Sequence, residues 1–159
     1  MLLLFLTLLA FAEDHRIDEL KPDQTTALGP YEASISSHHK HAGDGSATGI
    51  WTLSLAAGEY ARRIEHYGER FEIEILIGDT LLVGRPADKG AVKLLLLEQA
   101  PISMDTEAAE AAVREALGDK ATGALTSSKS SGLMHFSFAG AGDPVSASVG
   151  LFTHEVLIR

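Results

Sequence analysis

Residues 70–84, RFEIEILIGDTLLVG, contain the clearest structural signal of the chain. Apolar and charged residues alternate along the first half, with Phe71, Ile73, Ile75 and Ile77 in one set and Arg70, Glu72 and Glu74 in the other. A period of two is typical of a β-strand with one side in the core and one side in water. Gly78-Asp79 then predicts a tight turn into a second strand at residues 80–84. The stretch therefore predicts antiparallel sheet, with Glu72 and Glu74 on the solvent side.

Further strands are predicted on both sides of this stretch. Alternating or continuous apolar runs mark residues 31–37, 48–55, 59–67, 92–97, 133–139 and 145–159. The run at residues 92–97, VKLLLL, is continuous and predicts a central strand. The remaining segments are expected to be irregular: a polar stretch at 13–30 with at most one helical turn at 18–21, a loop at 38–46 and a mobile connector at 121–132.

One helix is predicted after residue 105. Asp105 is a suitable N-cap and Gly118 a suitable residue after the helix end. Apolar residues recur at intervals of three and four, namely Ala109, Ala112, Val113, Ala116 and Leu117. Glu110 and Arg114 have the spacing of an exposed ion pair. This order of elements predicts an α+β fold, a curved antiparallel sheet (half-open barrel) with one packed helix, forming a single domain over residues 13–159.

Composition excludes several classes of function. The 159 residues contain 13 Lys and Arg against 22 Asp and Glu, so the formal net charge is -9. Nucleic-acid binding is not expected, because neutralising phosphates requires clustered basic residues. The chain has no cysteine, which excludes thiol catalysis, thiolate metal sites and disulfides.

Residues 1–12, MLLLFLTLLAFA, predict a signal peptide. The apolar run is too short to span a bilayer, and Ala10-Phe11-Ala12 is a suitable cleavage site. No Lys or Arg precedes the run, so a buried first strand or helix is the alternative. If the segment is a signal, the mature protein is periplasmic or secreted, with no stable membrane span.

The densest group of titratable side chains is His38, His39 and His41. Imidazole binds zinc, copper and nickel, and Asp44 or His15 could add a ligand. Adjacent histidines point to opposite faces of an extended chain, however. A solvated polar loop is therefore the alternative to a metal site.

A second polar group comprises Glu65, His66, Glu72 and Glu74. Paired carboxylates could perform acid–base chemistry if one were buried, whereas simple cross-strand pairing with Arg62 or Arg63 is the alternative. The nucleophile elbow G-x-S-x-G, the phosphate-binding G-x-x-x-x-G-K-[ST] and the zinc motif H-E-x-x-H are all absent. A protein without enzymatic activity and without a cofactor is expected.

The order of strands and turns in residues 49–93 resembles a known pattern. Its elements are Gly49-Ile50-Trp51, Gly58-Glu59-Tyr60, Arg62 or Arg63, and Ile77-Gly78-Asp79-Thr80. They are similar to the repeated hairpins of the LolA-like periplasmic lipoprotein and lipid carriers, which include the LppX and LprG carriers. The resemblance implies a half-open antiparallel barrel that holds acyl chains, with Arg62 or Arg63 nearest to a role in ligand release. The chain departs from the family in its short length, its one strong helix and its lack of a lipobox cysteine. Its G-x-W triplet is also similar to that of lipocalins, which enclose apolar ligands.

These patterns lead to one expectation and two alternatives. The expected function is binding or carrying a lipid-like ligand on the inner side of the sheet. The predicted lining is Trp51, Leu53, Phe71, Ile73, Ile75, Phe136 and Phe138, although the same residues could form a filled core. The first alternative is a periplasmic metal-binding protein that uses His38, His39 and His41. The second is a structural or inhibitory domain whose acidic surface meets a transient, basic protein partner.

Overall fold

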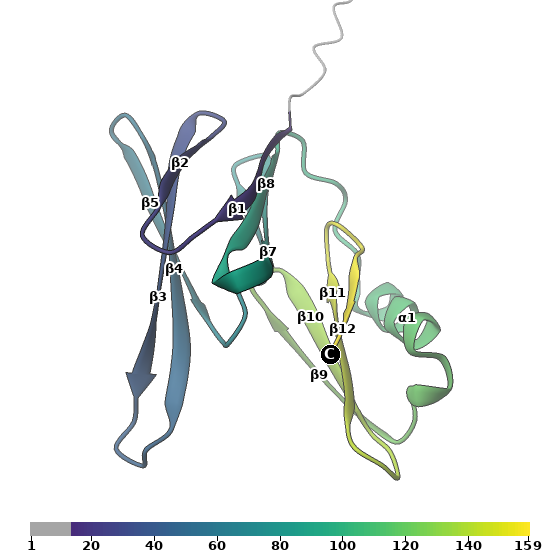
Figure 1. Ribbon diagram of the computed structural model, residues 1–159. Helices are drawn as coiled ribbons and strands as arrows, with labels where there is room; N and C mark the ends of the chain where they lie inside the picture. The colour runs from purple at the N-terminus through teal and green to yellow at the C-terminus, as the bar shows by residue number, and fades with distance from the viewer. Residues whose placement is uncertain (1–13) are drawn as a thin grey trace, which may run out of the picture.

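The computed structural model describes residues 14–159, so the predicted signal peptide at residues 1–12 lies outside the described residues. The described chain forms three four-stranded antiparallel sheets and one α-helix (Figure 1). The β2–β5 sheet contains β2 (Thr25–Leu28), β3 (Tyr31–His41), β4 (Ala47–Ala57) and β5 (Tyr60–Tyr67) in that order. The central sheet has the order β1 (His15–Leu20), β8 (Val92–Leu97), β7 (Thr80–Pro86) and β6 (Ile73–Ile77). The β9–β12 sheet contains β12 (Val156–Ile158), β11 (Val145–Gly150), β10 (Leu133–Ala139) and β9 (Ala124–Ser130).

The first core lies between the β2–β5 sheet and the central sheet. The inner face of the central sheet contributes Ile17, Ile73, Leu82, Val92, Leu94 and Leu96. The β2–β5 sheet contributes Leu28, Ala33, Ile35, Leu53, Leu55 and Ile64. Along β3, β4 and β5 these side chains alternate with polar ones, which gives the β2–β5 sheet one apolar face that packs on the central sheet.

The second core lies between the β9–β12 sheet and the helix. Helix α1 (Thr106–Leu117) covers the face of this sheet that is turned away from the other two sheets (Figure 1). It buries Ala109, Val113 and Leu117. Their partners on the sheet side include Met134, Phe136, Phe138, Ala147 and Val149. The small side chains of the helix allow close packing on the sheet.

The helix and most strands agree with the sequence-based prediction. Asp105 caps the helix by accepting a hydrogen bond from the backbone N–H of Ala108 at 2.8 Å. Glu110 and Arg114 form the expected ion pair at 2.7 Å. Strand β8 lies between β1 and β7, as its continuous apolar run predicted. The fold is α+β and mainly antiparallel, but the half-open barrel is not confirmed, because none of the sheets formed by residues 14–159 is closed.

Three segments predicted to be irregular are strands instead. The stretch 13–30 contains β1 and β2, because Ile17, Leu20 and Leu28 supply apolar side chains at core positions. The loop predicted at 38–46 is shorter, since β3 continues to His41 in register with β4. The connector predicted at 121–132 contains β9, whose seven residues all pair with β10. Pairing with a neighbouring strand overrides the weak local preference of each of these polar segments.

No helix in the described part of the chain is both long and apolar enough to cross a membrane.

Candidate functional site

The seven residues predicted to line a ligand cavity are divided between the two cores. Leu53, Phe71 and Ile73 are fully buried in the first core, where Trp51 and Ile75 pack as partly buried neighbours. Phe136 and Phe138 belong to the second core, under the helix. The structure therefore does not bring the seven side chains around one common space.

Glu72 and Glu74 are buried, which corrects the prediction that both are exposed to water. Their exposed fractions are 3% and 2%. Glu74 lies on the outer face of the central sheet and Glu72 lies just before β6; residues 152–159 at the end of the chain contact both carboxylates. Arg62 and Arg63 do not pair with them: Arg62 donates to the carbonyl oxygen of Leu76, and Arg63 pairs with Glu65 at 3.1 Å.

The Glu74 carboxylate joins the central sheet to the β9–β12 sheet. It pairs with Arg85 of β7 at 2.7 Å and accepts the backbone N–H of Phe152 at 2.8 Å. The hydroxyl of Thr153 donates to the same carboxylate, and Arg85 also pairs with Glu155 at 2.9 Å. We call Glu74, Arg85, Thr153 and Glu155 the Glu74 network. It fixes the turn between β11 and β12 against the central sheet.

Glu72 forms a second contact between the same two sheets. Its carboxylate pairs with Arg159 beyond β12, and Arg70 lies 3.9 Å away on the other side. Both buried carboxylates are thus paired with arginines. The acid–base alternative for these residues stays a prediction.

Two half-buried histidines lie near Glu72. His66 donates from Nε2 to the carbonyl oxygen of Arg70 at 2.8 Å, and burial lowers its pKa below the usual range. His135 contacts the hydroxyls of Ser148 at 2.7 Å and Ser130 at 2.8 Å. Burial is also the main cause of the lowered pKa of His135, and the positive charge of Arg159 adds to it. Both rings are therefore favoured as neutral imidazoles.

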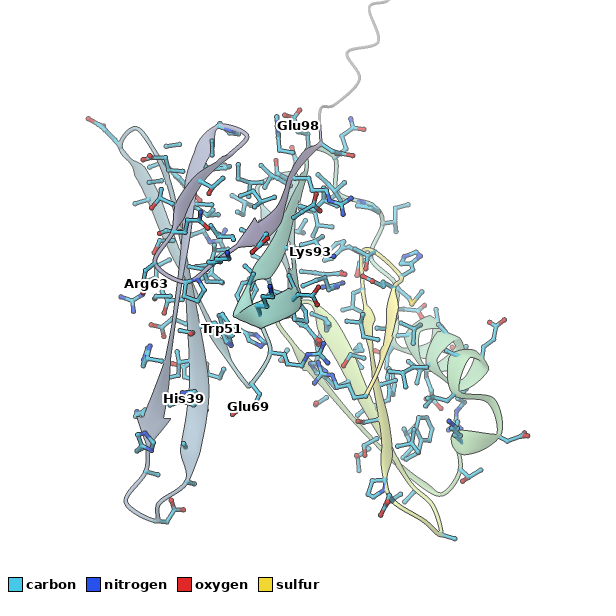
Figure 2. The ribbon with its side chains drawn as sticks, in the orientation of Figure 1. His39, Trp51, Arg63, Glu69, Lys93 and Glu98 are labelled. Carbon is cyan, nitrogen blue, oxygen red and sulfur yellow. The ribbon has the colours of Figure 1, made fainter. Side chains whose placement is uncertain are left out.

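The outer face of the central sheet also holds three neighbouring cations that sequence reasoning missed. Lys93 of β8 is the direct cross-strand partner of Arg85 on β7. Arg16 of β1 pairs in register with Leu95, two residues beyond Lys93 on the same face of β8. Figure 2 shows Lys93 on the central sheet, well away from His39 on the long arm formed by β3 and β4. One signal could have revealed the site: Lys93 interrupts an otherwise apolar strand, VKLLLL.

A cleft and a smaller pocket open beside these cations. The cleft has a volume of about 530 Å³, and five basic side chains line it: Arg16, Arg70, Arg85, Lys93 and Arg159. Glu72 and Glu155 are its acidic residues, and β12 forms one wall. We call this space the basic cleft.

The smaller space, of about 230 Å³, is the apolar pocket, lined by Val83, Leu94, Leu95 and Thr153. It shares Arg16, Arg85, Lys93 and Glu155 with the basic cleft, so the two spaces adjoin. The volume of the basic cleft is within the range of about 300–1,000 Å³ that is usual for small-molecule sites. Together they are the candidate site.

The three histidines of the predicted metal site do not converge. His38, His39 and His41 lie on β3 opposite Ile50, Gly49 and Ala47, so His38 faces away from the other two. The nearest carboxylate recorded for His39 is that of Glu69, at 4.0 Å. Within residues 14–159, no group of three or more His, Asp or Glu side chains is arranged to hold a metal ion.

Comparison of the chain with family models, with curated proteins and with solved structures found no match. The resemblance of residues 49–93 to the LolA-like carriers therefore stays a prediction from sequence.

Proposed function

We propose that this protein binds and carries a lipid-like hydrophobic ligand without transforming it chemically. The ligand would lie in the apolar pocket and the adjoining basic cleft, not among the seven residues named from the sequence. The main support is that Val83 and Leu95 line an open space on the outer face of the central sheet. Apolar walls with a few polar groups at one side are the usual composition of a small-molecule site.

The energy of such binding would come from burial. Each methylene group of the ligand that leaves water contributes about 0.8 kcal/mol. Several methylenes against Leu95 and its neighbours would therefore give measurable affinity. In this proposal the ligand lies between the central sheet and the end of the β9–β12 sheet. This arrangement takes the place of the half-open barrel expected from the sequence. The periplasmic or secreted location and the likeness to LolA-like carriers are parts of the same proposal.

Native mass spectrometry tests the proposal directly. The protein would be expressed from its full sequence and purified without added ligand. We expect an adduct of several hundred daltons that is lost under denaturing conditions and is extractable into organic solvent. A bare chain that also fails to bind a neutral apolar dye would contradict the proposal, and an adduct of metal mass would favour the metal-binding alternative.

A pair of matched variants locates the site. Leu95 and Leu97 are both partly exposed residues on the same face of β8, but only Leu95 lines the apolar pocket. Leu95→Glu is expected to weaken uptake of an apolar dye at least about tenfold, because it places a charge among buried methylenes. Leu97→Glu is the control and is expected to retain uptake. Equal effects of the two variants would move the site elsewhere.

A further inference from the structure

Three cations lie close together on the outer face of the central sheet at the candidate site. Arg85 and Lys93 are direct cross-strand partners, so two positive charges lie side by side on one face of the sheet. Like charges directly opposite each other destabilise a sheet. Arg16 adds a third cation on the adjacent strand β1. Because Glu74 and Glu155 already neutralise Arg85, a bound anion would interact mainly with Lys93 and Arg16.

The grouping of basic side chains at this site contrasts with the net negative charge of the whole chain. Acidic residues outnumber basic ones by 22 to 13. The basic cleft has the opposite balance, since five basic side chains line it beside Glu72 and Glu155. An excess of basic over acidic side chains in a cleft favours anionic ligands.

The cations differ in how far they are already neutralised. Arg85 is held by Glu74 and Glu155, at 2.7 and 2.9 Å. Within residues 14–159, Arg16 is paired only with exposed Asp18, at 2.5 Å. Lys93 has no carboxylate within ion-pair distance among residues 14–159. The exposed ammonium of Lys93 is therefore available to a ligand, and Arg16 can contribute with little loss.

The apolar and basic parts of the site are also continuous. Lys93 and Leu95 lie two residues apart on one face of β8, and Arg16, Arg85 and Lys93 line both spaces. A ligand with a tail against Leu95 would have its head beside Lys93. This arrangement matches a molecule with one apolar part and one charged end.

We infer that the ligand is an anionic amphiphile, whose carboxylate or phosphate group is bound by Lys93 and Arg16 and whose tail lies in the apolar pocket. This inference rests on the proposed function and specifies the ligand class for the same site. Charge-assisted hydrogen bonds from Lys and Arg are the strong ones for such groups.

Displacement of a neutral dye tests the inference. N-phenyl-1-naphthylamine would report occupancy, and the competitors would be decanoate, decyl phosphate, 1-decanol and decyltrimethylammonium at low ionic strength. We expect the two anions to displace the dye at concentrations about tenfold or more below that of 1-decanol. Burial alone predicts the reverse order, because the neutral alcohol is the more hydrophobic competitor.

Two variants of Lys93 and one control assign the preference to this site. Lys93→Met keeps the length and apolar stem of the side chain, and it should remove most of the anion preference, measured as the ratio between the displacing concentrations of 1-decanol and decanoate. Lys93→Glu should shift the preference toward decyltrimethylammonium. Lys40→Met, on β3 of the β2–β5 sheet, removes an exposed lysine elsewhere and should behave like the unmodified protein. An anion preference that survives both Lys93 variants would overturn the assignment.

The remaining outcomes separate this inference from the proposed function. Dye binding with 1-decanol as the best competitor would refute the anionic head and leave the hydrophobic ligand standing. Absence of binding by the dye and by every competitor would refute both. Calorimetry with inorganic phosphate distinguishes a lipid headgroup from a free anion: affinity equal to that of decyl phosphate would overturn the amphiphile.

Discussion

Replacing Glu74 by glutamine should destabilise the whole protein, although the two side chains have nearly the same shape. The carboxylate is fully buried and accepts hydrogen bonds from Arg85, from Thr153 and from the backbone N–H of Phe152. An amide at this position would direct N–H groups at donors and would leave the Arg85 guanidinium partly uncompensated in a buried site. Breaking a buried pair by removing one partner costs about 3–5 kcal/mol. That loss is a large part of the total stability of a domain, about 5–15 kcal/mol.

Equilibrium denaturation in urea measures this effect. Trp51, the only tryptophan of the chain, lies beside the first core, so its fluorescence reports on that core while circular dichroism follows the strands and helix together. Glu19→Gln is the control, since Glu19 pairs with Lys21 at 3.1 Å but both side chains are more than half exposed. Exposed pairs contribute about 0–1 kcal/mol, so the control should change stability little.

A double-mutant cycle completes the test. Arg85→Gln should also be strongly destabilising, because it leaves the Glu74 carboxylate buried without its cation. The double variant should lose less than the sum of the two single losses, by about 0.5–3 kcal/mol, because the residues are in contact. A loss of less than about 1 kcal/mol for Glu74→Gln, or strict additivity in the cycle, would refute the reasoning from buried charge.

Three further predictions concern other buried groups. Burial lowers the pKa of His66 and His135 in the folded state, so the unfolded chain takes up protons more readily. The stability due to the neutral rings is therefore present above about pH 6.5 and is lost as the pH falls below it. Replacing both by glutamine should therefore reduce the difference in urea midpoint between about pH 7.5 and pH 5; an unchanged difference would contradict the shifts. Gly132→Ala should cost about 1–3 kcal/mol more than Gly45→Ala in thermal unfolding, because both have positive φ but only a Cβ at Gly132 would overlap the backbone of β6. Thr52 has the buried hydroxyl that lacks a hydrogen-bond partner within the described chain, so Thr52→Val should be neutral or stabilising by about 1 kcal/mol, and a clear loss of stability would reveal a missed partner.

The local part of the fold could be predicted from sequence because its signals are short in range. The cap at Asp105 and the spacing of Glu110 and Arg114 depend on neighbours within four residues, and both are confirmed. The alternation from Phe71 to Ile77 identified the side chains that face the first core. Polar strand β9 was missed because its pairing with β10, and not its own composition, determines its structure.

The burial of Glu72 and Glu74 could not be predicted from the periodicity of the sequence. A period of two tells which residues share a face, and it does not tell what covers that face. Glu74 is covered by Phe152 and Thr153, 78 and 79 residues later in the chain. A charged residue on a strand face was therefore assigned to water, although the turn between β11 and β12 covers it.

The same distant contacts explain why the candidate site was missed. The sequence around Lys93 predicts a solvated lysine in an apolar strand. Lys93 belongs to a site because β12, which is distant in sequence, forms a wall of the cleft beside it. The Glu74 network fixes the turn that leads into β12 and neutralises Arg85 from both sides. Arg85 thus has a structural role in joining the central sheet to the β9–β12 sheet. Lys93 and Arg16 are not part of the Glu74 network, so their charges remain available to a ligand. Effects on stability and on ligand binding should therefore be separable. Glu74→Gln should lower both the free energy of unfolding and the affinity for ligand, because it weakens the attachment of the turn that leads into β12. Lys93→Met should change the ligand preference without lowering the free energy of unfolding.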